Sequence, residues 1–242
     1  MDKRKNMKQL NENIFHQYNK WKQGYVRKEN SLQMRLDNFL SNDRNSYSCY
    51  ISEDGKHVDC DTDIYIFDED LIDGKLPFPF GKIHGDFNCD GCAELISLEG
   101  APEEVEGNFA CSTCPNLTSL EGAPQIVNRG FSCNNCPKLT SLEGAPKEVG
   151  GSFYAQTCPN LTSLIGAPEK VGRSFYTNNC SNLISLEGAP KKVGRLFACS
   201  RCESLTSLEH LPKEIDRELV VDKRFEGQIP SDIKILKIRY TE

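Results

Sequence analysis

The chain has 242 residues, of which 38% are hydrophobic and 26% charged, and its formal net charge at pH 7 is −6. This is the composition of an ordinary soluble protein, and the length suffices for one large domain or two small ones. The sequence contains no run of 18 apolar residues, and no apolar segment follows the polar N-terminus. We therefore expect a cytoplasmic protein without a signal peptide and without a membrane span.

Charge is distributed unevenly over the first third of the chain. Residues 1–44 hold ten Lys or Arg against five Asp or Glu, whereas residues 45–74 hold one Lys against nine acidic residues. A basic segment beside an acidic one is more typical of mutual packing than of a nucleic-acid arm. The charge pattern therefore argues against a nucleic-acid partner.

Apolar residues recur at intervals of three and four in two N-terminal stretches, as on one face of a helix. The first stretch spans residues 7–25, and the second begins near Ser31 and includes Leu36 and Phe39. We expect the helical segment 1–44 to cap the part of the chain that follows it. The alternative is that its aromatic-rich stripe is exposed and binds a partner.

Residues 45–84 change to an alternation of period two, which predicts a β-rich N-terminal cap. A Ser-Glu-Asp-Gly-Lys turn separates two apolar runs, and in the second run apolar residues alternate with Asp59, Asp61 and Asp63. These acids also match the first, third and fifth positions of an EF-hand loop. The sixth position of that loop requires Gly and is Ile64 here, so the strand interpretation is favoured over a calcium site.

From residue 85 onward the sequence repeats its own pattern every 22 residues. Such a fixed period predicts a solenoid, in which each turn buries its apolar stripe against the neighbouring turns. The repeat is marked by Phe87, Phe109, Phe131, Phe153, Phe175 and Phe197, and Leu219 takes the next position. We predict a solenoid over residues 85–242, with residues 219–242 as a closing turn that carries Ile233, Leu236 and Ile238.

The spacing within one unit is F-x-C-x-x-C-x-x-L-x-x-L, as in Phe109, Cys111, Cys114, Leu117 and Leu120. This spacing resembles the cysteine-containing form of the leucine-rich repeat. The resemblance covers about two thirds of the chain. It implies an α+β solenoid, that is, an arc with a parallel β-sheet on the concave face, here with an N-terminal helical and β cap. The Val of each unit lies four positions ahead of Phe, one more than in that family, which predicts a wider loop before the strand.

A Gly-Ala-Pro triplet follows the second Leu of most units. Both Gly and Pro oppose a helix, so we expect the convex side of the arc to be non-helical. Such a thin layer predicts a gently curved solenoid with a shallow sheet. Shallow faces suit protein partners better than small ligands.

Ten of the twelve cysteines lie in the repeats, and four pairs have the Cys-x-x-Cys spacing that is typical of zinc sites. In two units the first Cys is replaced, by Ala155 and by Thr177, while Cys158 and Cys180 remain. This pattern favours small buried core positions over a metal-binding or redox role. We expect no metal, no cofactor and, in a reducing compartment, no disulfide between neighbouring repeats.

No catalytic motif is present, because the four histidines are scattered and the sequence lacks a nucleophile elbow, a phosphate-binding glycine loop and a zinc-protease motif. We therefore expect a protein that is no enzyme. The prediction is a protein-binding module, either an adaptor or an inhibitor, that engages an intracellular target through the concave sheet face. The near-identical repeats have a bacterial or phage-like character, and a phage or bacterial effector directed against host defence is one version of this role.

Because side chains alternate along a strand, the residues on either side of each inward Phe point to the outer surface. In the middle turns these outward residues are mostly Arg, Tyr, Asn and Gln. Arg and Tyr are enriched at interface hot spots, and the arginines predict a partner with an acidic patch. The predicted partner-binding residues are Arg129, Tyr154, Arg173, Tyr176, Arg195, Arg217, Asn134, Gln156 and Asn178. The alternatives are solvated strand positions without a partner, and a small anionic ligand such as a nucleotide held by Arg173, Arg195 and Tyr176.

Overall fold

The computed structural model describes residues 31–41 and 48–242. The chain divides into two compact units, residues 1–45 and residues 46–242. In the first unit, the described residues form helix α2, and in the second they form a long series of short strands.

Helix α2 spans Leu32–Ser41 and confirms the helix predicted to begin near Ser31. The hydroxyl oxygen of Ser31 accepts a hydrogen bond from the backbone N–H of Met34 at 3.2 Å, which satisfies one of the free donors of the first turn. The helix predicted over residues 7–25 lies outside the described residues. Among the helices of the described residues, none has the length and apolarity needed to cross a membrane.

The second unit begins with the hairpin of β1 (Cys49–Ile51) and β2 (Val58–Cys60), which are antiparallel. The strands and the turn of this hairpin are those predicted from the alternation within residues 45–84. β2 and β3 (Ile64–Tyr65) also pair in parallel with β4 (Phe80–Ile83) and β5 (Phe87–Asn88), so the stacked strands begin before residue 85. Cys49 and Cys60 face each other across the hairpin and form a disulfide. Disulfides persist in oxidising compartments. The disulfide therefore runs against the cytoplasmic location expected from the sequence, which stays a prediction.

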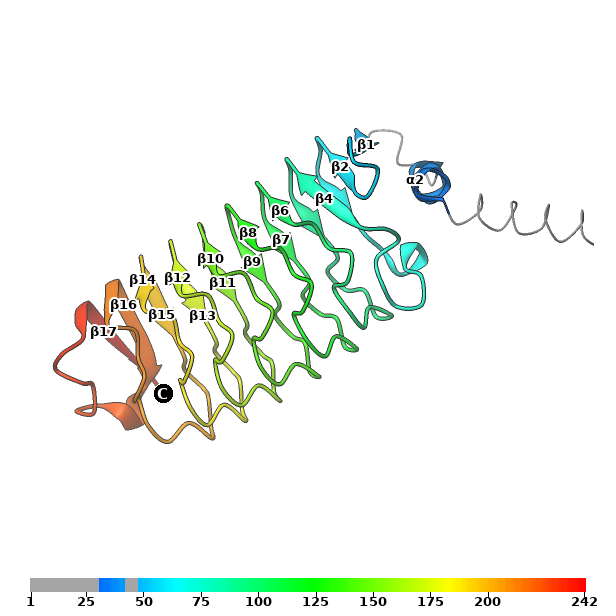
Figure 1. The fold of residues 1–242 in the computed structure, drawn as a ribbon. Helices are drawn as coiled ribbons and strands as arrows, with labels where there is room; N and C mark the ends of the chain where they lie inside the picture. The colour runs from blue at the N-terminus through cyan, green and yellow to red at the C-terminus, as the bar shows by residue number, and fades with distance from the viewer. Residues whose placement is uncertain (1–30, 42–47) are drawn as a thin grey trace, which may run out of the picture. The chain divides into compact units, whose positions relative to one another are not determined.

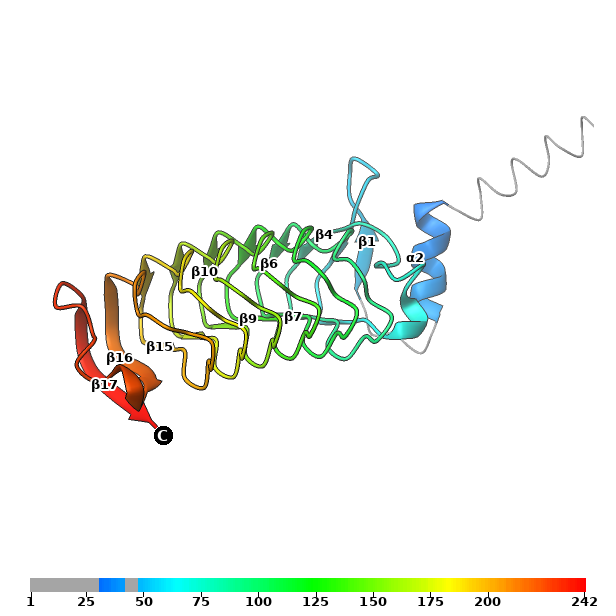
Figure 2. The same ribbon diagram turned by 90° about the horizontal axis from the view of Figure 1, so that it is seen from below.

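From β2 onward the chain winds into a parallel β-solenoid of stacked turns, confirming the solenoid predicted from the 22-residue period (Figure 1). Each turn contributes two short strands, and these stack in two columns (Figure 2). The first column contains β2, β4 (Phe80–Ile83), β6 (Glu104–Val105), β8 (Ile126–Val127), β10 (Glu148–Val149), β12 (Lys170–Val171) and β14 (Lys192–Val193). The second contains β3 (Ile64–Tyr65), β5 (Phe87–Asn88), β7 (Phe109–Ala110), β9 (Phe131–Ser132), β11 (Phe153–Tyr154), β13 (Phe175–Tyr176) and β15 (Leu196–Ala198). The longer β16 (Glu214–Asp222) and β17 (Lys234–Thr241) run through both columns.

The register between the repeats follows the sequence period without a shift. Val105 pairs with Val127 in the first column, and Phe109 pairs with Phe131 in the second. The Val that was predicted to precede a wide loop therefore lies in a strand of its own. The turn thus has two strands with a short bend between them, in place of one strand and a loop.

Helix is nearly absent from residues 48–242, where the helical segments are the 3₁₀ turns η1 (Asp68–Asp70) and η2 (Lys223–Phe225). The side of the turns that carries the Gly-Ala-Pro triplets is therefore non-helical, as predicted. The class that the structure supports is a parallel β-solenoid with little helix.

The core is a column of stacked phenylalanine rings, one from each repeat. All six Phe side chains from Phe87 to Phe197 are fully buried. Successive ring centroids lie 5.1–5.5 Å apart, and the ring planes differ by 3–13°. Each buried Phe contributes about 1.5–3 kcal/mol through the hydrophobic effect, and each stacked pair adds about 0.5–1.5 kcal/mol. The ring column thus holds neighbouring turns together.

The ring column continues into the closing turn with aliphatic residues. Leu219 is fully buried in the slot of Phe and pairs with Ile238 of β17. Ile235 pairs with Ile215 in the first column. Of the apolar residues predicted for the closing turn, Leu236 is instead 81% exposed, because strand alternation turns it away from the core, and Ile238, in the last strand β17, is 37% exposed.

The Gly of each Gly-Ala-Pro triplet is required by the backbone. Gly144 has a φ of +91°, a conformation that side chains rarely adopt. A Cβ at this position would lie 2.3 Å from the backbone nitrogen of Glu121 in the preceding turn. The Ser two residues before each Glu is also structural, since the hydroxyl of Ser119 accepts the N–H of Glu121 at 3.0 Å. These bonds account for the near-invariant Ser-Leu-Glu-Gly sequence.

We expect Gly144→Ala to lower the free energy of unfolding by about 3 kcal/mol, because it combines backbone strain with a clash between two turns. Gly91→Ala is the matched control, since Gly91 also has a positive φ, +77°, but a Cβ there would meet nothing within 4 Å. Gly91→Ala should lower the free energy of unfolding by about 1 kcal/mol. Urea denaturation of both variants measures the difference, and equal losses would contradict the close approach of the turns.

Candidate functional site

The outer surface of the second strand column displays two stacked tyrosines. Tyr154 and Tyr176 follow the inward Phe of β11 and β13 and pair with each other in register. Their rings are 5.1 Å apart with planes that differ by 4°, and both side chains are half-buried. The register that stacks Phe inside the solenoid therefore stacks Tyr on its surface.

A column of arginines runs beside the tyrosines, in the bend between the two strand columns. We define the Arg–Tyr face as Arg129, Tyr154, Arg173, Tyr176, Arg195 and Arg217. All four arginines are exposed. Backbone N–H to carbonyl bonds of 2.7 Å and 3.0 Å link Arg195 to Arg173 and Arg217 to Arg195. None of the four guanidinium groups forms an ion pair or hydrogen bond with another residue of the described ranges.

Charges on the first strand column, by contrast, are paired with one another. Lys82 lies 3.3 Å from Glu104 and 3.0 Å from Glu106, and hydrogen bonds to Glu106 and Glu104 raise its pKa. Lys192 lies 2.9 Å from Glu214, whose pKa is lowered by that bond. The first column is therefore locally neutralised, whereas the Arg–Tyr face presents positive charge to solvent.

A hollow of about 500 Å³ lies on this face between Arg129 and Arg173. We call it the arginine hollow. Tyr154 lines it together with Asn108, Asn128, Gly130, Gly150, Gly151 and Ser152, and no acidic residue lines it. The hollow exists because Gly151 occupies the position that is Arg in the preceding and following turns. The structure thus brings together Arg129, Tyr154 and Arg173 of the predicted residues.

The predicted amides have a different environment. Oδ1 of Asn134 accepts the backbone N–H of Gln156 at 2.8 Å. Oδ1 of Asn178 accepts the N–H of Ser200 at 3.0 Å and its hydroxyl at 2.9 Å. Both amide oxygens therefore connect neighbouring turns. Of the three predicted amides, Gln156 alone has a side chain without a hydrogen bond to a described residue.

Two of the aspartates that match an EF-hand, Asp59 and Asp63, are engaged in similar inter-turn bonds. Oδ1 of Asp59 accepts the N–H of Lys82 at 2.7 Å, and Oδ1 of Asp63 accepts the N–H of Asp86 at 2.7 Å. Asp86 accepts the N–H of Asn108 in turn. Carboxylates thus satisfy backbone donors at the bends of the first turns. Over residues 31–41 and 48–242, no three His, Cys, Asp or Glu residues are grouped to hold a metal ion.

The ten repeat cysteines are free and buried. Sγ of Cys114 donates to the carbonyl oxygen of Cys89 at 3.3 Å, and the other second-position cysteines make the same contact to the preceding turn. Thr177 replaces a first-position Cys and donates its hydroxyl to the Ala198 carbonyl at 3.3 Å. Burial raises the pKa of Cys158 to about 12. The thiols are therefore protonated near neutral pH, and metal binding or nucleophilic chemistry requires a thiolate.

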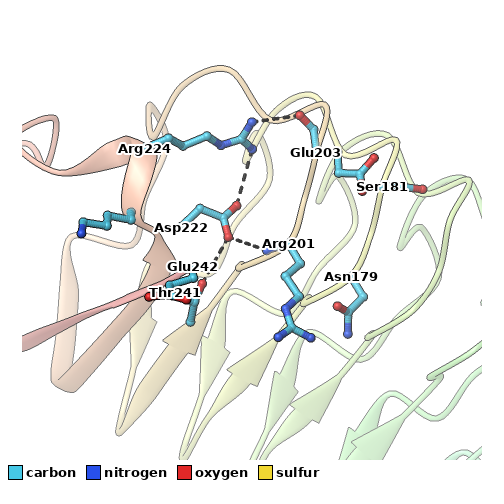
Figure 3. A pocket seen from close by; sticks show the side chains of 9 residues that line it. Asn179, Ser181, Arg201, Glu203, Asp222, Arg224, Thr241 and Glu242 are labelled. Atoms are coloured by element: carbon cyan, nitrogen blue, oxygen red, sulfur yellow. Dashed lines mark hydrogen bonds and ion pairs between the residues drawn. The ribbon is translucent and has the colours of Figure 1, made fainter.

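A second hollow, of about 540 Å³, lies near the C-terminal end of the solenoid (Figure 3). Asp222 is at its centre, where it accepts the N–H of Arg201 at 2.7 Å and the hydroxyl of Thr241 at 3.2 Å. Its other oxygen lies 3.5 Å from Arg224, which also donates to the carbonyl oxygen of Glu203. These groups satisfy one another, which makes this hollow a less favourable ligand site than the arginine hollow. Sequence reasoning missed it because Arg224 and Thr241 lie beyond the last regular repeat.

Comparison of the chain with protein-family models, with characterised proteins and with solved structures finds no match. The fold class of this protein therefore rests on its structure alone. The described residues of the second unit form a parallel β-solenoid, and its surface carries the Arg–Tyr face.

We expect the ten repeat cysteines to be unreactive toward a thiol reagent such as DTNB at pH 8 while the protein is folded, because they are buried and protonated. All ten should react in denaturant, whereas the disulfide-bonded Cys49 and Cys60 should not. A strong chelator should leave the melting temperature unchanged. Fast reaction of a native thiol, or zinc bound at one or more per chain, would contradict the structural role.

Proposed function

We propose that this protein is a non-catalytic protein-binding module of the leucine-rich-repeat type that engages its partner through the Arg–Tyr face. The observation that carries the proposal is the contrast between two surfaces of one solenoid. Ion pairs neutralise the first strand column, whereas the side chains of Arg173, Arg195 and Arg217 lie in consecutive turns and form no ion pair with a described residue, Asp216 and Glu218 being the acidic residues that flank Arg217 in the chain. Like charges so close together are repulsive unless an anionic group lies against them.

The tyrosines support a protein partner. Tyr154 and Tyr176 present a rigid, half-buried aromatic surface of two rings beside the arginines. Tyr and Arg are the residue types most enriched at interface hot spots, and rings fixed by stacking lose little conformational freedom on binding. The partner expected from this chemistry is a protein with an acidic patch.

The leucine-rich-repeat assignment is supported by the 22-residue period and the F-x-C-x-x-C-x-x-L-x-x-L spacing, whose apolar positions are all buried in the core. The two strands in each turn depart from an arc with a single concave sheet. An adaptor or inhibitor of an intracellular protein, including a phage or bacterial effector against host defence, is the role that we propose for such a face.

A second candidate function is the binding of a small anionic ligand, and the arginine hollow favours it. The predicted site for that ligand was Arg173, Arg195 and Tyr176. The hollow lies one turn earlier and is lined by Arg129, Arg173 and Tyr154. Only Arg173 is common to both sets, so the two versions can be separated by substitution.

Replacement of Arg173 and Arg195 by Glu should make the binding free energy of an acidic partner less favourable by about 3 kcal/mol or more, because charge pairs are lost and repulsion is added. Folding should persist, because exposed substitutions change stability by about 0.5 kcal/mol each. The control is Lys138→Glu with Lys147→Glu, which makes the same charge change at exposed positions outside the face. Calorimetric titration with a partner identified by affinity capture measures the effect.

The tyrosines give an independent test of the same face. The double substitution Tyr154→Ala, Tyr176→Ala should also weaken binding of the partner, because the stacked aromatic surface is lost. Unchanged affinity in both this variant and the Arg173→Glu, Arg195→Glu variant would place the binding surface elsewhere on the chain.

A further inference from the structure

We propose that the arginine hollow is a binding site for a phosphate monoester dianion. The inference deepens the proposed function, since it names the anion that the Arg–Tyr face receives. Four features of the hollow support it: the spacing of Arg129 and Arg173, the glycine backbone between them, the neutral hydrogen-bond donors around them, and a lining without an acidic residue. Each is a property of residues 108–173 of the second unit.

The spacing of Arg129 and Arg173 sets the size of the anion. The two residues are two turns apart in the same column, which corresponds to ~9.6 Å at the ~4.8 Å spacing of neighbouring strands. Their side chains can therefore approach one central group from opposite sides. Arg173, Arg195 and Arg217 lie in consecutive turns and leave no empty turn between them for such a group.

The base of the hollow is backbone without side chains. Gly150 and Gly151 follow each other at this point, and Gly130 lies in the turn before. A Cβ at Gly150 would lie 2.2 Å from the carbonyl oxygen of Asn128, so the neighbouring turns exclude a side chain here. The packing of the turns thus keeps Gly150 bare, and the absence of a side chain at Gly151 leaves the opening between Arg129 and Arg173.

The remaining lining supplies neutral donors and one aromatic wall. The hydroxyl oxygen of Ser152 accepts the N–H of Ser174 at 3.3 Å, which leaves its own proton available for a ligand. The side chain of Asn128 has no hydrogen bond to a described residue. The ring of Tyr154 leans toward the hollow, since its Cε2 would lie 4.0 Å from a Cβ at Gly130.

This arrangement suits a phosphate better than a carboxylate. A carboxylate has two oxygens in one plane, and a single arginine can satisfy both. A phosphate monoester carries a charge of about −1.5 to −2 and three terminal oxygens that point in different directions. The guanidinium groups of two arginines two turns apart, together with the Ser152 hydroxyl, can serve oxygens that point in different directions. The volume of about 500 Å³ also leaves room for the group esterified to the phosphate beside Tyr154.

Calorimetric titration of the full chain with phenyl phosphate, and with benzoate as the carboxylate control, tests the proposal. We expect phenyl phosphate to bind at one site per chain and benzoate to bind about tenfold more weakly or not at all. Arg129→Ala and Arg173→Ala should each reduce phenyl phosphate affinity by about tenfold or more. Lys147→Ala, which removes an exposed charge outside the face, should leave the affinity unchanged.

Two further ligands identify the source of the phosphate. Tighter binding of AMP than of phenyl phosphate would assign a free nucleotide. Tighter binding of a phosphotyrosine peptide than of its unphosphorylated form would assign a modified protein partner. Either result supports the site.

Equal affinity for benzoate and phenyl phosphate would overturn the proposal, as would Arg129→Ala and Arg173→Ala variants that bind like the wild type. Its failure can be separated from failure of the protein-binding function. If phenyl phosphate does not bind but the Arg173→Glu, Arg195→Glu variant still loses its protein partner, only the phosphate site is wrong. If phenyl phosphate binds but both that variant and the Tyr154→Ala, Tyr176→Ala variant keep the protein partner, the protein-binding function of the face is wrong.

Discussion

The stacking of each turn on the next in strict register is the interaction on which the rest of the structure depends. Strands of two residues, such as β7 and β9, have no partner within their own turn and bond only to neighbouring turns. Phe109 likewise has its ring neighbours, Phe87 and Phe131, in the turns before and after. A single turn is therefore unstable in isolation, and stability is a sum of contacts between adjacent turns.

The same constraint decides which polar residues can occupy the bends and the buried corners. Each bend leaves backbone groups that must be satisfied, and Asp86, Asn108 and Asn134 do so with side-chain oxygens. In the interior the small S–H donors of cysteine contact carbonyl oxygens, and the hydroxyl of Thr177 can take the same role. The abundance of cysteine therefore follows from packing between turns, whereas the four arginines of the Arg–Tyr face have side chains that this packing does not use.

The sequence predicted the features that depend on period and alternation. The 22-residue spacing of Phe places Phe153 inside and Tyr154 outside, and it stacks Tyr154 on Tyr176. It did not predict the separate strand at Val105, because the bend before Phe109 depends on backbone contacts with adjacent turns. The arginine hollow and the role of Asn134 were missed for the same reason. A cavity formed by missing side chains, and an amide bonded to the next turn, become visible only when three successive turns are placed together.

The arginine hollow has a consequence for how such a protein can change over generations. The distance between Arg129 and Arg173 is fixed by the number of turns between them, and the intervening repeat is similar in sequence to its neighbours. Unequal recombination between similar repeats removes or adds whole 22-residue units and preserves every inter-turn register. Loss of one unit would place the two charges in adjacent turns, and gain of one would move them a further ~4.8 Å apart. Repeat copy number can therefore alter the anion that such a surface accepts, without a substitution in either arginine.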